Sequence, residues 1–324
     1  MKAWRVHAWG EPETMSLEDI PMPAPGAGQV RIRNHAAGLN FFDILQVQGK
    51  YQIKPPFPFT PGAEVAGIVD AVGSGVTDFA SGQRVLAITH GAGMAEYTLS
   101  RADMTFLVPD GMDFAEGAAL PIVYHTSYFA LRDRAPVRPG EWLLVHAGAS
   151  GVGVSAIQLG LAFGARVIAT AGSPEKLEFA KAQGAEYALS YSDETWVEQV
   201  KQLTGGRGAD VIYDPVGGDV FDLSTKCIAS EGRLIVIGFA SGRIPSIAAN
   251  RILLKNISIV GALWGGHALA YPEYLGQAQR ALADLYSKGA IRPPRPIEYA
   301  LDQAPAALRD LANRKVLWKA VLTM

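Results

Sequence analysis

Three glycines near the middle of the chain, Gly148, Gly151 and Gly153, have the spacing of a phosphate-binding loop. They lie in the stretch VHAGASGVGVSAIQ, between an apolar strand-like run and an apolar helical pattern. Glycine lacks the Cβ that would keep backbone from approaching a pyrophosphate, and the N-terminus of the following helix favours an anion. We therefore assign phosphate binding to these glycines together with Ser150 and Val152. A tight strand-to-helix turn is the alternative interpretation.

The stretch ATAGSPEK (169–176) carries residues that would distinguish the two nicotinamide dinucleotides. In a dinucleotide-binding fold that prefers NAD, an acidic residue about 20 positions after the glycines binds the ribose 2′-hydroxyl. Here Gly172 and Ser173 form the turn, Lys176 follows, and the first acid, Glu175, already lies beyond the turn. A hydroxyl and a cation suit a 2′-phosphate, which a carboxylate would repel. The pattern favours NADPH over NADH, although Ser173 is also typical of a helix N-cap beside a solvated Lys176.

These loops need a sheet to hold them, and the pattern from about residue 140 onward predicts one. Six strand-like runs alternate with helical patterns such as SPEKLEFAKAQG, and the runs are WLLVH, ARVIAT, YALSY, DVIYD, RLIVIG and ISIVGAL. Strict alternation of strand and helix indicates a parallel sheet covered on both faces. The fold class is therefore α/β, with a doubly wound Rossmann domain that contains a six-stranded parallel sheet.

The rest of the chain predicts a second, β-rich domain. Up to about residue 120, short strand patterns such as GQVRIRNHAAGLN, EVAGIVDAVGSGV and GQRVLAI indicate a compact antiparallel, barrel-like domain. After residue 263 come a helical pattern, a Pro-rich segment and the strand-like WKAVLTM, which we expect to return to the first domain.

Composition limits the classes of partner. The chain has 324 residues with 29 basic and 31 acidic side chains, a net charge of −2, and no basic block. Nucleic acid and anionic membrane are therefore not expected partners. No run approaches the ~18 apolar residues of a membrane span, and the N-terminal stretch lacks the apolar core of a signal peptide. Cys227 is the only cysteine, which excludes an intramolecular disulfide. These features predict a cytoplasmic protein.

With these motifs placed, the chain resembles the medium-chain dehydrogenase/reductase superfamily, and within it the zinc-independent NADPH:quinone oxidoreductases of the zeta-crystallin-like branch. The resemblance lies in the glycine loop and in AAGLNFFDILQVQGKY, PFTPGAEVAGIVDAVGSGV, ATAGSPEKLEFAKAQGA, VIYDPVGGDVFD and GRLIVIGFASG. It implies a GroES-like β-barrel catalytic domain of residues 1–122 and 267–324 and a Rossmann NADPH-binding domain of residues 123–266. It also implies an active site between the two domains and a homodimer.

The resemblance also implies roles for individual residues. Three would act in catalysis: Asn40 and Thr126 would line the nicotinamide end of the cofactor, and Tyr51 would face the substrate. The others would bind cofactor: Tyr191 and Lys319 would join Ser173 and Lys176 around the 2′-phosphate, while Phe239, Ala240, Leu263 and Trp264 would present backbone to the carboxamide. Each of these residues also has a structural alternative. Asn40 could be a helix N-cap with Asp43 three residues on and Gly49 at the helix end, and Tyr51 could simply pack beside a Pro-rich loop.

A catalytic zinc is not expected. Zinc-dependent members of the superfamily carry a Gly-His-Glu motif, and the corresponding stretch here is Gly62-Ala63-Glu64, with alanine in place of the histidine. The six histidines show no paired ligand spacing, and Cys227 lies far from this motif. Without a metal to stabilise an alkoxide, hydride transfer to an electrophilic quinone or α,β-unsaturated carbonyl is the favoured reaction.

Two other functions remain open from the sequence. An enoyl-thioester reductase, acting on an enoyl-CoA or enoyl carrier-protein substrate, would share this fold and cofactor. A non-catalytic NADPH-binding protein, crystallin-like or RNA-binding-like, would share them too. The balanced charge disfavours RNA, and turnover of any acceptor would exclude a purely binding role.

Overall fold

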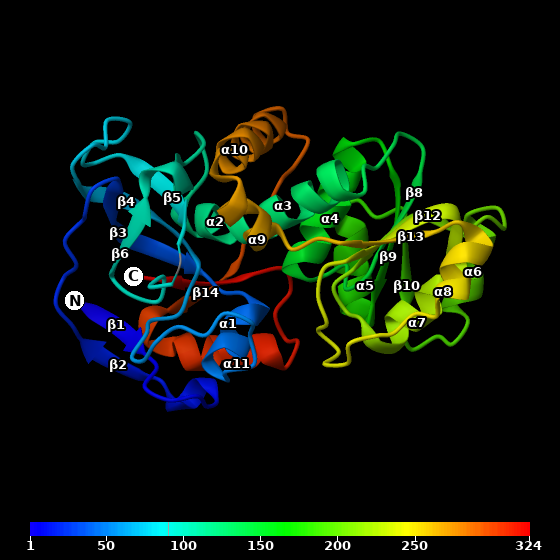
Figure 1. Ribbon diagram of the computed structural model, residues 1–324, viewed down its shortest axis with the longest axis horizontal. Coiled ribbons are helices and arrows are strands. Elements are labelled where there is room, and N and C mark those ends of the chain that lie inside the picture. The colour runs from blue at the N-terminus through cyan, green and yellow to red at the C-terminus, as the bar shows by residue number, and fades with distance from the viewer. Residues whose placement is uncertain (90) are drawn as a thin grey trace. The chain divides into compact units, whose positions relative to one another are not determined.

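The computed structural model describes residues 1–89 and 91–324, so His90 lies outside the described residues (Figure 1). The chain forms two compact units. The first unit comprises Met1–Ile122, Pro272–Gln279 and Pro293–Met324, and the second comprises Val123–Tyr271 and Arg280–Arg292. Each unit is described by itself below.

The first unit is built on strands from both ends of its sequence. Strands β1 (Lys2–Arg5) and β2 (Ser16–Asp19) form an antiparallel pair. A seven-stranded sheet has the order β14-β15-β3-β4-β5-β7, with β6 also paired to β3. Its strands are β3 (Gln29–Gly38), β4 (Glu64–Val72), β5 (Arg84–Ile88), β6 (Tyr97–Arg101), β7 (Thr105–Leu107), β14 (Ile297–Ala300) and β15 (Ala320–Thr323). Among these pairings, only that of β14 with β15 is parallel. The predicted GroES-like β-domain is therefore confirmed.

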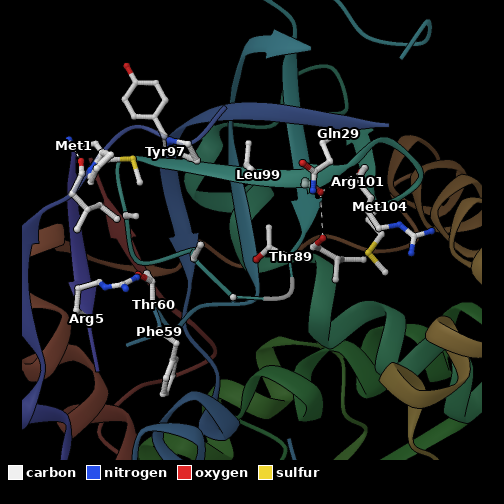
Figure 2. A pocket seen from close by; sticks show the side chains of 18 residues that line it. Met1, Arg5, Gln29, Phe59, Thr60, Thr89, Tyr97, Leu99, Arg101 and Met104 are labelled. Carbon is white, nitrogen blue, oxygen red and sulfur yellow. Dashed lines mark hydrogen bonds between the residues drawn. The ribbon is translucent and has the colours of Figure 1, made fainter. Parts of the chain in front are cut away.

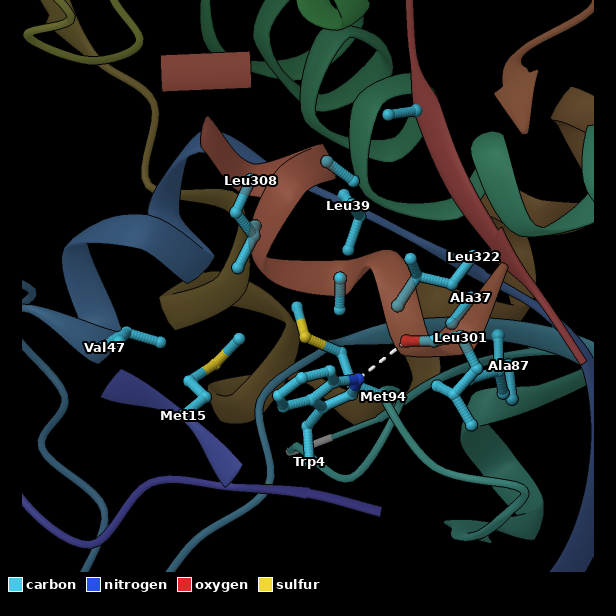
Figure 3. Packing of buried hydrophobic residues seen from close by; sticks show 14 of the residues in the cluster. Trp4, Met15, Ala37, Leu39, Val47, Ala87, Met94, Leu301, Leu308 and Leu322 are labelled. Atoms are coloured by element: carbon cyan, nitrogen blue, oxygen red, sulfur yellow. Dashed lines mark hydrogen bonds between the residues drawn. The ribbon is translucent and has the colours of Figure 1, made fainter. Parts of the chain in front are cut away.

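A hydrophobic core joins the N-terminal and C-terminal segments of this unit. Trp4, Leu39, Met94, Leu301 and Leu322 belong to one buried cluster (Figure 3). The indole Nε1 of Trp4 donates to the carbonyl of Leu301 at 2.7 Å, so its one polar group is satisfied inside the core. The helices that begin or lie in this unit are α1 (Phe41–Val47), α2 (Phe114–Ala119), α3 (Pro121–Tyr128), α10 (Pro272–Ser287) and α11 (Ala304–Ala312).

The second unit contains a six-stranded sheet of order β10-β9-β8-β11-β12-β13, and every pairing in it is parallel. The strands are β8 (Trp142–Val145), β9 (Arg166–Ala171), β10 (Tyr187–Ser190), β11 (Ala209–Asp214), β12 (Ile228–Val236) and β13 (Ser258–Gly261). The connecting helices are α4 (Gly151–Ala162), α5 (Pro174–Ala182), α6 (Trp196–Leu203), α7 (Gly218–Cys227), α8 (Ala249–Lys255) and α9 (Trp264–Ala270). Each strand-like run of the sequence is one of these strands, which confirms the Rossmann domain.

In the part of the chain that the structure describes, no helix is long and apolar enough to cross a membrane.

Candidate active site

The glycine loop connects β8 to α4, as the sequence predicts. Ser150 is the N-cap of α4, and its Oγ accepts a hydrogen bond from the Gly153 N–H at 3.1 Å. A Cβ on Gly153 would lie 2.1 Å from the Ala147 carbonyl oxygen, and a Cβ on Gly148 would lie 2.8 Å from the Ala169 Cβ. Close packing of the loop on itself at Gly153, and on β9 at Gly148, therefore already favours glycine at these two positions. The tight-turn interpretation and phosphate binding are compatible here.

Two backbone N–H groups at this helix N-terminus lack an acceptor within the part of the chain that the structure describes. Of the first amides of α4, that of Gly153 donates to Ser150 Oγ, whereas the N–H groups of Gly151 and Val152 make no hydrogen bond among residues 1–89 and 91–324. The first N–H groups of a helix are unpaired within the helix and favour an anion. The loop thus offers the donors that a pyrophosphate would need.

Tyr191 reaches the glycine loop from the end of β10, which is separated from β8 by β9 in the sheet. It follows β10, and its N–H donates to the Ala171 carbonyl at the end of β9. Its phenol oxygen accepts a hydrogen bond from the Ala147 N–H at 2.7 Å. Ala147 has a φ of +51°, in the left-handed region that a residue with a side chain rarely adopts. Tyr191 therefore helps to hold the loop in this conformation.

In the turn after β9, Ser173 caps a helix, which is the structural role that the sequence also allowed for it. Ser173 is the N-cap of α5 and accepts from the Lys176 N–H at 3.4 Å, with Pro174 in the first turn of the helix. Gly172 is exposed, and a Cβ there would meet no atom within 4 Å. This turn, Tyr191 and the glycine loop follow β9, β10 and β8, which are adjacent strands. The structure therefore brings the predicted phosphate-binding residues of the second unit to the carboxyl ends of three adjacent strands.

A buried histidine that the sequence analysis did not assign to the site lies under the glycine loop. His146 has no exposed surface and bonds through Nδ1 to Thr170 Oγ1 at 2.8 Å and through Nε2 to Ser224 Oγ at 2.7 Å. The Ser224 hydroxyl donates to the Val220 carbonyl, so Nε2 must carry the proton that bonds to Ser224. Burial lowers the pKa of His146 to about 3, which keeps it neutral. The hydrogen bonds of the His146 side chain connect the end of β8 to β9 and α7.

The remaining cofactor candidates of the second unit follow the last two strands or lie on α3. Phe239 and Ala240 follow β12 and are exposed, and the Ala240 N–H donates to the Pro215 carbonyl. Leu263 and Trp264 follow β13, and Leu263 is 71% exposed whereas Trp264 is buried. Thr126 lies on α3. Its neighbour His125 packs on Trp264, with ring centroids 5.4 Å apart.

In the first unit, Asn40 begins α1 and is 7% exposed. Its N–H donates to Asp43 Oδ2 at 2.7 Å, and Gly49, just beyond the helix, has a φ of +68°. The structural alternative for Asn40 is therefore confirmed. Because the cap uses the Asn40 backbone N–H, the side-chain amide makes other contacts: Nδ2 donates to Glu64 Oε1 at 2.7 Å, and Oδ1 accepts from Lys319 Nζ at 2.9 Å.

Lys319 lies in the first unit, whereas Ser173, Lys176 and Tyr191 lie in the second. It is 3% exposed and pairs with the fully buried Glu64 at 2.5 Å. Its ammonium also donates to the Leu39 carbonyl and to Asn40 Oδ1, so all three of its N–H groups are used. No donor is left for a phosphate. We therefore propose a role beside Asn40 for Lys319, in place of the predicted role at the 2′-phosphate.

Asp43 and Tyr51 complete this buried polar region. Burial raises the pKa of Asp43 to about 7, against the lowering effect of the Asn40 N–H and Lys319. Its Oδ1 is buried without a hydrogen-bond partner in normal geometry among the described residues. Burial, and then the charge of Asp43, raise the pKa of Tyr51, so its phenol keeps its proton at neutral pH. The Tyr51 ring packs beside Phe42, with centroids 5.4 Å apart.

A pocket of about 420 Å³ in the first unit lies elsewhere (Figure 2). It is lined by Arg5, Phe59, Thr60 and Met104, among other residues, and by none of the predicted site residues. Arg5 donates to the Pro58 carbonyl and the Thr60 hydroxyl, so its guanidinium is held by the pocket wall. Within residues 1–89 and 91–324, no group of three or more His, Cys, Asp or Glu side chains could hold a metal ion.

Comparison with known proteins assigns both units. Residues 26–112 match the alcohol dehydrogenase GroES-like domain, and residues 151–280 match the zinc-binding dehydrogenase domain. This pair of domains defines a medium-chain dehydrogenase/reductase.

The relatives define the branch. A quinone oxidoreductase-like protein 2 homolog from Nematostella vectensis is 40% identical over 300 residues, which cover 92% of this chain and 82% of the relative. A quinone oxidoreductase from Pseudomonas aeruginosa is 37% identical over 97% of both chains. The solved structure of Escherichia coli quinone oxidoreductase complexed with NADPH matches with a TM-score of 0.93 and 29% identity over 100% of both chains. The chain therefore belongs to the quinone oxidoreductase family.

Proposed function

We propose that this protein uses NADPH to reduce quinones or activated alkenes by hydride transfer, without a catalytic zinc, in the cytoplasm. The observation that carries the proposal is the set of donors at the carboxyl ends of β8, β9 and β10. These are the free N–H groups of Gly151 and Val152, the Ser173–Lys176 turn, and Tyr191. The structure of the E. coli relative with NADPH supports the same cofactor for this chain.

Bound NADPH would supply the hydride. The residues of the chain then have to bind the cofactor, orient its nicotinamide ring and protect the site from water. The α4 N-terminus and the glycines would hold the pyrophosphate, and Ser173, Lys176 and Tyr191 would surround the 2′-phosphate. Thr126 and the backbone of Phe239, Ala240, Leu263 and Trp264 would orient the nicotinamide, together with Asn40. Tyr51, protonated at neutral pH, would be available as a proton donor to the product of the acceptor.

Replacing Lys176 with glutamate tests the cofactor preference. The change removes a cation and adds an anion beside the proposed 2′-phosphate, and losing a charge-assisted contact costs about 1.5–3 kcal/mol. NADPH affinity should therefore fall about tenfold or more, with NADH affinity little changed. Dissociation constants from cofactor fluorescence measure both. Lys181→Glu, on the same helix and exposed, is the matched control. Equal weakening of both cofactors by Lys176→Glu would contradict the assignment.

The acceptor is tested by turnover of a quinone, an enone and an enoyl-CoA ester, each with saturating NADPH and with or without a chelator. Tyr51→Phe removes only the phenol oxygen. A quinone gives a stabilised hydroquinone anion that solvent can protonate, so its turnover should survive. An enone gives a more basic enolate, for which a positioned acid is worth ~10²–10⁴-fold.

Four results would change the proposal. Loss of activity on chelation would reintroduce a metal. Preference for the enoyl-CoA ester would favour an enoyl-thioester reductase. Absence of turnover with every acceptor would favour a binding protein. Loss of quinone turnover in folded, NADPH-bound Tyr51→Phe would show that Tyr51 is indispensable.

We also propose the domain assignment given by the family, with residues 1–122 and 267–324 as the catalytic domain and 123–266 as the cofactor domain, and a homodimer. Strand β13 supports the dimer, because it forms an edge of the six-stranded sheet and, among residues 1–89 and 91–324, pairs only with β12. On the preceding helix α8, Leu253 and Leu254 are 74% and 79% exposed. Such an edge favours strand addition. The molar mass from light scattering tests it, and a monomer at micromolar concentration would refute it.

A further inference from the structure

We propose that Lys319 and Glu64 are positioning residues whose buried ion pair fixes the orientation of the Asn40 amide. Through that orientation, Asn40 presents one N–H as a donor to the molecule being reduced or to the nicotinamide. This inference rests on the proposed function, because it assumes that Asn40 touches one of them. Lys319 and Glu64 themselves act only through Asn40.

The chemistry of the two partners leaves the amide one orientation. A lysine ammonium can only donate, so it must face the amide oxygen, and it lies 2.9 Å from Asn40 Oδ1. Glu64 Oε1 faces the amide nitrogen at 2.7 Å. A flip of the amide would place oxygen against carboxylate and NH₂ against ammonium. The second N–H of Nδ2 has no protein acceptor in the described part of the chain, which leaves it for a bound molecule.

The pair is itself held by the backbone. Glu64 Oε2 accepts from the Ile122 N–H at 2.7 Å, while Oε1 accepts from both Asn40 and Lys319. Lys319 Nζ has a third acceptor in the Leu39 carbonyl at 2.8 Å. Because each charged group has several partners, neither side chain can rotate away without leaving a buried donor or acceptor unpaired.

Strand register explains why these residues meet. Gly38 pairs with Glu64 across β3 and β4, and with Val321 across β3 and β15. Asn40 comes two residues after β3 and Lys319 directly before the antiparallel β15, so both lie at the same end of the strands. A Cβ on Gly38 would lie 2.5 Å from Glu64 Oε1 and 2.3 Å from the Ala118 carbonyl oxygen. The glycine at this position leaves the space that the carboxylate occupies.

Stability alone does not account for the pair. Removing two charges from water costs about as much as their attraction returns, and apolar residues of similar size are often as stable. Both members of this ion pair make hydrogen bonds to the Asn40 amide, and apolar residues in their places could not. Asp43, another buried polar side chain of this region, bonds to the Asn40 backbone and not to its amide.

The test is a mutant cycle on turnover. Asn40→Ala is measured in the natural background and in the double variant Lys319→Met/Glu64→Gln, which is neutral and so avoids an unpaired buried charge. In the natural background, Asn40→Ala should lower kcat about tenfold or more. The double variant should lower kcat by a similar factor, with the KM for NADPH changed less than about threefold. Asn40→Ala should then add little to the double variant.

The possible outcomes distinguish the inference about the ion pair from the proposed function. If Asn40→Ala lowers kcat by the same factor in both backgrounds, the amide works without the pair and the inference is overturned, while the proposed function stands. If Asn40→Ala leaves kcat unchanged in the natural background, Asn40 is not at the reacting atoms and both the inference and that part of the proposed function fail. Urea unfolding and NADPH titration show that each variant is folded and binds cofactor. Lys319→Arg, which keeps the charge, should restore more of kcat than Lys319→Met does.

Discussion

Lys319→Met alone is expected to destabilise the first unit by about 3–5 kcal/mol, the usual cost of removing one member of a buried ion pair. Glu64 is 0% exposed and Lys319 is 3% exposed, so neither charge can be transferred to water while the strands stay paired. Without the ammonium, the Glu64 carboxylate stays buried with only the N–H donors of Asn40 and Ile122. The free energy of unfolding in urea at pH 7 measures the loss.

The double variant Lys319→Met/Glu64→Gln provides the contrast. Because it leaves no unpaired charge, its stability should lie closer to that of the natural chain than either single variant does. Lys315→Met is the surface control, since Lys315 pairs with Asp310 at 3.2 Å but is 67% exposed, and such pairs contribute about 0–1 kcal/mol. Additive losses from the two buried substitutions would show that the charges do not depend on each other.

Asp43→Asn should remove a fall in stability between pH 4 and pH 7. The carboxyl has an ordinary pKa of 3.8, and burial raises it to about 7 in the folded protein. Between these values the native chain keeps a proton that the unfolded chain has released, so stability falls as pH rises through this range. Below the lower value both states are protonated, and above the upper value both are ionised. A shift of about 3 units corresponds to roughly 4 kcal/mol.

Asparagine keeps an oxygen that can accept from the Asn40 N–H, so the substitution tests charge rather than shape. The measured quantity is the difference in unfolding free energy between natural chain and variant at pH 4, 5.5, 7 and 8. The variant should gain stability relative to the natural chain as pH rises. Asp302→Asn, at an exposed carboxylate, controls for general effects of charge. A difference that does not change with pH would mean that Asp43 is already ionised in the folded protein at pH 4.

Periodicity predicted the second unit well because its signals are local. The run WLLVH became β8, the loop that follows became the N-terminus of α4 with Ser150 as its cap, and SPEKLEFAKAQG became α5. Each signal is complete within about a dozen residues. Alternation with helices also restricts the possible orders of the parallel strands, because crossover connections between them are right-handed.

Periodicity could not predict the buried cluster of Asn40, Glu64 and Lys319 in the first unit. Asn40 and Lys319 are 279 residues apart, and Glu64 lies on a third strand. Each residue alone has an ordinary interpretation, as a cap, a surface lysine or part of a motif that lacks its histidine. The signal that could have united them is Gly38, a glycine inside a strand pattern, which often marks the close approach of another group. The short run at 319–323 did not indicate its partner strand.

The pairing of β15 with β3 also affects how the protein can be synthesised. Residues Ala36–Gly38 pair with Val321–Thr323, so this part of β3 stays unpaired on one side until β15 has been synthesised. At ~5–20 residues per second, that wait is on the order of tens of seconds, during which Glu64 has no counter-ion. Residues 123–292, which include the whole second unit, emerge earlier and can fold first. A chain truncated before residue 319 would keep all residues of the second unit but leave this edge of β3 unpaired, and an unpaired strand edge can pair with another chain.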